Sequence, residues 1–269
     1  MAISLSSLTS SKKVYPPKVV IYGVDGVGKT SLASEWPDPL YLATEGEAPP
    51  SDIEMATPSD ENGNPKPIET FDELLTIFGE LLTEEHAFKT VIIDSLDGLE
   101  SLVWQATCAR LGINSIEEAG YGKGYIEADT EWKDYLGAIG ALARSGVSVV
   151  QLAHPEIVRF DSPTTDPYSR YGIKLHKRAN ALIREQADIV AFMNYRISLK
   201  EKDVGFNKKV SHAEGGNERI IHLSEKAGFV AKNRMSAPDS IPYKKGQGYA
   251  SLSKFFPTDN DNAAQEEAA

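Results

Sequence analysis

Short apolar runs alternate along the chain with stretches whose apolar residues recur at helical spacing. The runs are rich in β-branched residues and predict buried strands at 19–22, 40–45, 88–95 and 146–154. The periodic stretches predict helices at 71–82, 96–111, 132–142 and 175–186. Strands that alternate with helices favour an α/β fold with a doubly wound, mainly parallel sheet and right-handed crossovers.

The remaining segments are predicted as connections or as a C-terminal antiparallel extension. Residues 220–223 and 229–232 look like antiparallel strands after a polar connection over 200–218. Residues 120–125 are predicted as a flexible glycine-rich loop. The segment 155–174 has three prolines and no periodicity, which predicts a long loop. Structureless loops of about twenty residues are uncommon in compact domains and are usually functional.

The first apolar run leads into a glycine-rich loop that fits G-x-x-x-x-G-K-[ST], with a strand before it and a helix after it. Glycines let successive backbone N–H groups point at phosphate oxygens, and the helix adds the positive end of its dipole. Lys29 is expected to reach the β- and γ-phosphates of ATP, and the Thr30 hydroxyl to ligate Mg²⁺. The predicted nucleotide-binding residues are Gly23, Val24, Asp25, Gly26, Val27, Gly28, Lys29, Thr30 and Ser31.

Polar residues end the other predicted parallel strands, and the carboxyl ends of such strands share one edge of the sheet. Asp94 is predicted to hold Mg²⁺, although a carboxylate here also suits a cap of the next helix. Glu45 and Glu47 are alternative general bases that orient and deprotonate water. His154 is either a sensor of the γ-phosphate or a buried structural histidine.

Composition narrows the class of protein. The chain has 269 residues, 41% of them hydrophobic, and its net charge of −11 argues against a uniformly basic nucleic-acid coat. No apolar run reaches the roughly 18 residues of a membrane span, and no signal-peptide pattern is present, which predicts a cytoplasmic protein without membrane contact. The single cysteine, Cys108, excludes an internal disulfide. Residues 1–13 and the acidic 257–269 are predicted to be disordered tails of one domain over 14–256.

The pattern resembles the RecA-like recombinase ATPases, and more closely the short single-domain RecA-like phage proteins that promote single-strand annealing. The resemblance covers roughly residues 18–256. It is carried by the P-loop, the strand ending at Glu45, the Asp94-Ser95 pair, the end of the strand before His154, and Ala231-Lys232-Asn233-Arg234.

The resemblance implies roles for residues outside the P-loop. Glu45 matches the catalytic glutamate and His154 the polar sensor, while Lys232 and Arg234 match a basic pair that reaches a neighbouring subunit's γ-phosphate. An ordinary basic strand end is the other interpretation of that pair. The segments 120–125 and 155–174 match the DNA-binding loops, although a loop that closes over nucleotide would look similar. The implied DNA-binding residues are Tyr121, Lys123, Tyr125, Arg159, Phe160, Arg170, Tyr171, Lys174 and Lys177.

The resulting hypothesis is a Mg²⁺-dependent ATPase that binds single-stranded DNA and promotes annealing in homologous recombination. We expect a homo-oligomer, phage-encoded and acting in the host cytoplasm, with a single-strand-binding protein or another recombination protein as a further partner. The family's amino-terminal helical polymerisation domain has no counterpart here, which favours annealing over strand exchange. The alternative is a nucleotide-switched assembly protein that docks a protein partner, and a small-molecule kinase ranks third.

Overall fold

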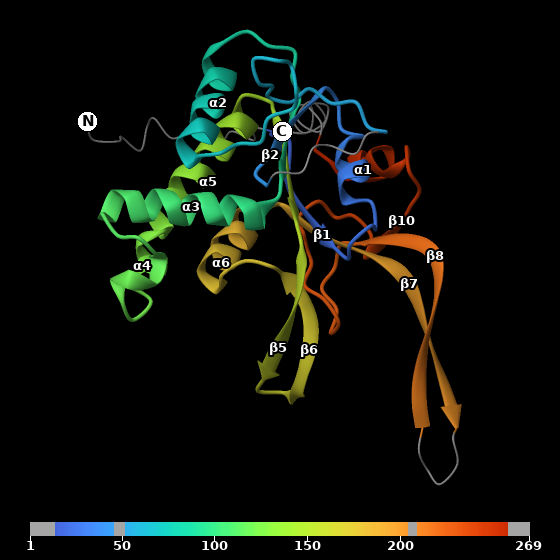
Figure 1. Cartoon of the computed structure of the whole chain (residues 1–269). Helices are drawn as coiled ribbons and strands as arrows, with labels where there is room; N and C mark the ends of the chain where they lie inside the picture. Colours follow the sequence, from blue (N-terminus) through green and yellow to red (C-terminus); the bar gives the residue numbers. More distant parts are fainter. Residues whose placement is uncertain (1–13, 46–51, 204–208, 258–269) are drawn as a thin grey trace, which may run out of the picture.

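The computed structural model describes residues 14–45, 52–203 and 209–257, and its centre is a mixed sheet (Figure 1). In the described part of the chain the strand order is β10-β8-β7-β1-β4-β3-β2, with β9 paired to β7. The run from β7 to β2 is parallel, and β8, β9 and β10 are antiparallel. The predicted α/β sheet with a C-terminal antiparallel extension is confirmed. The strands are β1 Lys18–Gly23, β2 Pro39–Ala43, β3 Thr90–Asp94, β4 Ser148–Ala153, β7 Ile189–Asp203, β8 Lys209–His222, β9 Lys232–Asn233 and β10 Ser240–Tyr243.

Alternate residues of the central strands bury their side chains on opposite faces of the sheet, because successive Cβ atoms of a strand point to opposite sides. Val20 and Tyr22 pack on one face against the larger helices, whereas Val19 and Ile21 pack on the other against the P-loop helix and C-terminal residues. The first face carries α2 Phe71–Thr83, α3 Leu96–Leu111, α5 Asp129–Arg144 and α6 Lys177–Gln186, and the second carries α1 Lys29–Ala33 and α7 Gly248–Leu252 (Figure 1).

The segment expected as a long loop at 155–174 forms an antiparallel hairpin, β5 Pro155–Ser162 and β6 Thr165–Ile173. Both faces of this hairpin are partly exposed, so its alternation of apolar and polar residues is weak. Its prolines lie at the start of β5, in the turn and near the tip of β6, positions where a missing N–H disturbs little pairing. The prediction of a structureless loop was wrong because partial exposure weakens the alternation of the two strands and because the prolines lie where they do not prevent pairing.

A second hairpin replaces the expected polar connection over 200–218. Strand β7 extends through 200–203 and β8 through 209–218, and the two strands project from the body of the molecule on the same side as β5 and β6 (Figure 1). Long strands that leave the core lose the apolar pattern by which buried strands are recognised.

The expected loop at 120–125 is a turn followed by the short helix α4 Lys123–Glu127. Gly124 is buried there, and the position needs glycine because a Cβ would lie 1.9 Å from the Ile116 carbonyl oxygen. The two 3₁₀ segments, η2 Ile116–Ala119 and η3 Ser253–Phe255, complete the described elements.

Helix α6 is anchored to α3 through a buried carboxylate. Both oxygens of Glu100 accept a hydrogen bond from the His176 backbone N–H, at 3.0 and 3.1 Å. The Glu100 residue is 7% exposed. Burial, with the nearby Asp97 and Glu156 carboxylates adding to it, raises the pKa of Glu100 to about 7. Glu100 therefore changes charge near neutral pH.

Replacing Glu100 with Gln is expected to remove one part of the pH dependence of stability. Because the folded pKa lies above the unfolded value, the folded state holds the extra proton between those pKa values, and stability falls as pH rises toward 7. Urea unfolding at pH 5 and pH 8 should show wild type losing on the order of 2 kcal/mol more than Glu100→Gln. The exposed Glu80→Gln is the control, and equal losses in wild type and Glu100→Gln would contradict the assignment.

Candidate functional site

The carboxyl ends of β1, β2, β3 and β4 meet around one cavity of 370 Å³. The cavity brings together the P-loop, Asp94, Glu45 and His154, which the sequence analysis placed at a common edge of the sheet. Glu47 lies outside the described residues. The lining residues are Asp25, Gly26, Lys29, Thr30, Tyr41, Glu45, Asp94, Ser95 and His154.

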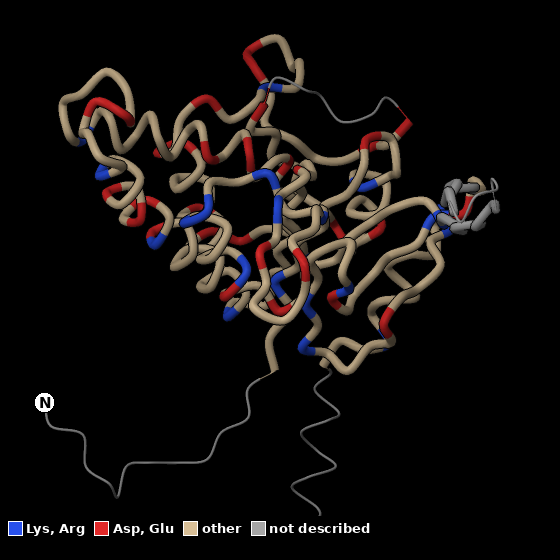
Figure 2. Tube along the Cα trace, turned by 90° about the horizontal axis from the view of Figure 1, so that it is seen from below, with Lys and Arg blue, Asp and Glu red and all other residues tan. Residues whose placement is uncertain are grey.

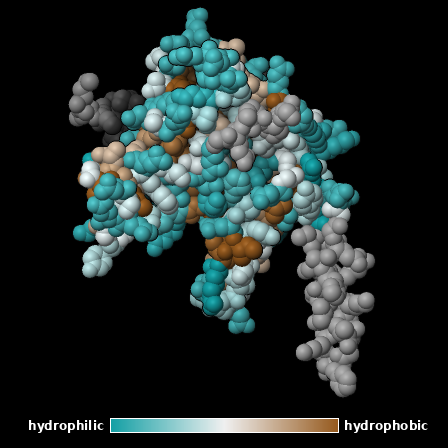
Figure 3. All heavy atoms as spheres, viewed as in Figure 1, coloured by the Kyte–Doolittle hydropathy of each residue, from teal (hydrophilic) through white to brown (hydrophobic). Residues whose placement is uncertain are grey.

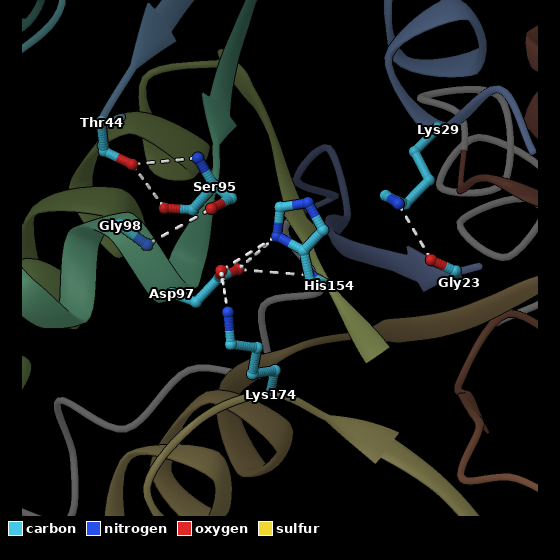
Figure 4. Close-up of polar contacts among 8 residues, drawn as sticks. All are labelled: Gly23, Lys29, Thr44, Ser95, Asp97, Gly98, His154 and Lys174. Carbon is cyan, nitrogen blue, oxygen red and sulfur yellow. Dashed lines mark hydrogen bonds and ion pairs between the residues drawn. The ribbon is translucent and has the colours of Figure 1, made fainter. Parts of the chain in front are cut away.

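The P-loop backbone needs its glycines. A Cβ at Gly23 would lie 2.1 Å from the Met193 carbonyl oxygen, and Gly28, which precedes α1, has a φ of 97° that L-residues rarely adopt. The Lys29 ammonium donates to the Gly23 carbonyl oxygen at 2.9 Å (Figure 4). Burial lowers the pKa of Lys29 against the opposing effect of Asp25 and Asp94. The ammonium is thus held across the loop, ready for an incoming phosphate.

Asp94 and Thr30 converge as the sequence predicted for a Mg²⁺ site. The Thr30 hydroxyl donates to Asp94 Oδ2 at 3.0 Å, and the Tyr41 hydroxyl donates to the same oxygen at 2.9 Å. Burial raises the pKa of Asp94, although these hydrogen bonds and Lys29 oppose it. A hydroxyl and a carboxylate are hard oxygen ligands, so this donor set fits Mg²⁺, which would neutralise phosphate charge here.

Glu45 and His154 approach a third residue, Asp97, in the first turn of α3. Ligand atoms of the three side chains lie within 4.8 Å of one another. Asp97 accepts from the His154 backbone N–H at 3.2 Å and pairs with His154 Nδ1 at 2.9 Å. Burial alone would raise the pKa of Asp97, but the hydrogen bonds from His154 lower it overall. The sequence analysis missed Asp97, whose only signal is its place three residues after Asp94.

The end of β2 is fastened to the start of α3, which sets the place of Glu45. The Thr44 hydroxyl accepts from the Ser95 N–H at 2.9 Å, and Ser95 caps α3 by accepting from the Gly98 N–H at 3.3 Å (Figure 4). A Cβ at Gly98 would lie 2.4 Å from Glu45 Cγ. Only glycine lets α3 pass this close to Glu45.

Arg219 of β8 is a second residue that the sequence analysis missed. A Cβ at Gly28 would come within 3.0 Å of Arg219 Nη1, so the guanidinium lies against the P-loop. Beside it is a cavity of 490 Å³ lined by β8 and β10 residues, including Tyr243. The Tyr195 hydroxyl of β7 also donates to the Gly26 carbonyl oxygen at 3.2 Å. These strands border the P-loop only through long-range sheet pairing, so no local motif marks them.

Lys232 and Arg234 lie beside the start of β7, at the edge of the sheet opposite the P-loop. The Lys232 ammonium donates to the carbonyl oxygens of Arg184 and Glu185 at 2.6 and 3.0 Å. Arg234 donates to the Glu185 carbonyl oxygen at 3.2 Å. Within this chain the pair is remote from the nucleotide cavity and binds the end of α6.

The sequence-predicted DNA-binding residues separate into exposed ones and internally bound ones. Tyr121, Lys123, Arg159, Lys174 and Lys177 are exposed. Exposure does not exclude internal partners, since Arg159 pairs with Asp161 at 2.8 Å and Lys174 with Asp97 at 3.4 Å.

The other four residues of the set are only partly exposed and are held by the protein itself. Arg170 pairs with Glu225 at 2.6 Å and stacks over the Phe160 ring. Tyr171 stacks on Phe192, and Tyr125 stacks on His176 with ring centroids 4.2 Å apart.

The charged surface residues that the structure describes do not form separate basic and acidic faces in the view of Figure 2. Figure 2 shows basic and acidic residues interspersed along the trace rather than separated into faces. Figure 3 shows a hydrophobic patch at the root of the β5–β6 hairpin. Ile157 of β5 is 69% exposed.

Residues 15–235 match a family of AAA domains, AAA_24. The chain belongs to this family. Together with the P-loop geometry and the mainly parallel sheet, membership supports nucleotide binding and hydrolysis by this AAA_24 protein as a P-loop ATPase.

Other comparisons add little to this assignment. A KaiC-like protein from the hyperthermophilic archaeon Pyrococcus horikoshii OT3 is 16% identical over 87% of this chain and 88% of that chain, with a TM-score of 0.41. No curated protein matches this AAA_24 protein. None of its described helices has the length and apolar character needed to cross a membrane.

Replacing Arg219 with Ala is expected to weaken nucleotide binding, because a guanidinium against the P-loop supplies a charge-assisted hydrogen bond to phosphate. The Kd for a fluorescent ATP analogue should rise about tenfold, the equivalent of a charged hydrogen bond. Arg196→Ala, on the neighbouring strand and paired with Glu218, is the matched control. An unchanged Kd in Arg219→Ala would remove Arg219 from the site.

Proposed function

We propose that this AAA_24 protein is a phage-encoded recombination protein that couples Mg²⁺·ATP binding and hydrolysis to binding and annealing of single-stranded DNA. The observation that carries the proposal is the direct continuity between the nucleotide cavity and the β5–β6 hairpin. His154 lines the cavity, and β5 begins at the next residue. The hairpin therefore follows a wall of the nucleotide cavity directly in the chain, with no intervening linker.

The cavity residues divide the chemistry of hydrolysis among them. Lys29 neutralises charge on the β- and γ-phosphates, and Thr30 with Asp94 would hold Mg²⁺. Glu45 orients water for in-line attack and accepts its proton. His154 contacts the γ-phosphate and senses whether it is present.

The exposed residues of the predicted DNA-binding set suit a single strand. Lys177 supplies charge for phosphates, and so do Arg159 and Lys174 if a strand displaces their present partners, Asp161 and Asp97. The fully exposed Tyr121, beside α4, supplies a ring on which a base can stack. Phe160, Arg170, Tyr171 and Tyr125 are internally stacked or paired, so their part in DNA binding is to shape the surface that presents the exposed residues.

Hydrolysis is proposed to require assembly. Lys232 and Arg234 are distant from the cavity of their own chain, so they would serve the cavity of a neighbouring copy. A cation supplied in trans stabilises the charge of the transition state and makes the rate depend on the oligomer. A single-strand-binding protein or another recombination protein is the further partner.

One observation favours a second candidate function, a nucleotide-switched protein that docks a protein partner. Ile157 is exposed on β5, whose outer edge pairs with no other described strand. An open strand edge with an exposed apolar side chain suits strand addition by a protein.

The decisive measurement is steady-state ATP hydrolysis with and without single-stranded DNA, at low and moderate salt, with Lys29→Ala as the blank. Stimulation that fades with salt is expected, because phosphate contacts release counterions. A rate indifferent to DNA, together with absent DNA binding, would reject the recombination function and favour the docking function.

The trans role is tested by mixing two inactive variants. Lys29→Ala lacks its own site but keeps the basic pair, whereas the double variant Lys232→Ala/Arg234→Ala has the reverse defect. Each alone should hydrolyse ATP on the order of a thousandfold more slowly than wild type. Mixed oligomers should regain part of the activity, since one copy completes the other's site.

Two controls separate this result from a folding defect. Lys226→Ala removes another exposed lysine, which pairs with Asp239 at the surface, and should hydrolyse ATP normally. Thermal unfolding reports whether the double variant stays folded. A folded double variant that the mixture fails to rescue would argue against the trans role.

A further inference from the structure

The Asp97 side chain is nearly enclosed and joins segments that come from three parts of the chain. It is 7% exposed, lies in the first turn of α3, and pairs with His154 at the end of β4. The Lys174 ammonium, just after β6, lies 3.4 Å from Asp97 Oδ2. One carboxylate thus contacts both ends of the β5–β6 hairpin and a wall of the nucleotide cavity (Figure 4).

Helix capping does not account for this arrangement. An acidic residue in the first turn of a helix is favourable through the helix dipole alone. Here Ser95 already caps α3, through the Gly98 N–H. Besides the neighbouring Ser95 hydroxyl, Asp97 contacts His154, just after β4, and Lys174, just after β6. The side chain therefore serves the hairpin junction rather than its own helix.

Asp97 determines how the His154 ring presents itself. The carboxylate accepts from Nδ1, so that nitrogen carries a proton, and the other ring nitrogen points away from Asp97 (Figure 4). A second hydrogen bond, from the His154 backbone N–H to the same carboxylate, fixes the backbone as well. Ring and backbone are held by one group.

Lys174, just after β6, contacts both His154 and Asp97. The Lys174 backbone N–H donates to the His154 carbonyl oxygen at 2.9 Å, and its ammonium reaches Asp97. A displacement of His154 is therefore transmitted to Lys174 through two contacts, one through the backbone and one through the carboxylate.

We propose that Asp97 is a positioning residue that holds His154 toward the nucleotide and links it, through Lys174, to the base of the β5–β6 hairpin. The link to nucleotide rests on the proposed function of His154. The orientation of His154 by Asp97 does not, and can be tested without nucleotide.

The first experiment reads the His154 ring in nucleotide-free protein. The chain has 5 histidines, so ¹⁵N-histidine NMR with His154→Gln identifies the signal. Wild type should show the Nδ1-protonated tautomer, and Asp97→Asn should shift toward a mixture, because an amide offers both donor and acceptor. Asp134→Asn, an exposed acid of α5, should leave the spectrum unchanged.

The second experiment reads the hairpin by hydrogen exchange of 155–173, with and without Mg²⁺ and a non-hydrolysable ATP analogue. The analogue should change exchange in wild type but not in Asp97→Asn or Lys174→Met. Lys174→Met should keep the wild-type His154 tautomer, which separates the hairpin link from ring orientation. In Asp97→Asn, kcat should fall between about tenfold and a hundredfold, with KM within about threefold of wild type.

The outcomes distinguish a failure of the Asp97 proposal from a failure of the proposed nucleotide function, on which the link from nucleotide to hairpin rests. An Asp97→Asn protein with wild-type tautomer and wild-type hairpin response would overturn the proposal even if ATP is hydrolysed. Wild type that binds the analogue no better than Lys29→Ala would overturn the nucleotide function instead. In that case an altered tautomer in Asp97→Asn would still support the orientation of His154 by Asp97.

Discussion

The parallel pairing of β1 with β4 and of β3 with β4 is the constraint on which the site depends. In this register Tyr22 lies opposite Ala153, and Asp94 lies opposite Leu152. The residues that follow these strand ends therefore enter the same cavity. A slip of one residue would turn every buried side chain to the other face, so burial of both faces fixes the chemistry along with the fold.

The sequence was sufficient to place at the cavity those residues whose positions follow local rules. The P-loop is contiguous, and Asp94, Glu45 and His154 each end an apolar strand whose direction is set by the alternation with helices. Asp97 and Arg219 follow no such rule. Asp97 meets His154 across 57 positions of sequence, and Arg219 reaches Gly28 only because β8 joins the sheet beyond β7. Their roles depend on long-range packing, which local pattern does not encode.

The two hairpins show the same limit of local sequence patterns for the fold. Buried strands are recognised by apolar runs, whereas β5 and β6 are partly exposed on both faces and lack such runs. These two strands stabilise each other through pairs such as Phe160 with Tyr168 and Phe160 with Arg170. Lys174 belongs both to the predicted DNA-binding residues and to the contacts of Asp97. It is predicted as a DNA contact, and its ammonium is bound to Asp97. One cation cannot fully neutralise Asp97 and a phosphate together, so the proposed DNA strand would compete with Asp97 for the Lys174 ammonium.

The length of the β5–β6 hairpin would amplify any rotation about its junction with the nucleotide cavity. Strands of its length reach about 26 Å at roughly 3.3 Å per residue. A rotation of about 10° at His154 and Lys174 would therefore carry the tip roughly 4 to 5 Å. A rotation of this size would move the residues at the cavity very little. The same rotation would move the hairpin tip by about the spacing between neighbouring β-strands.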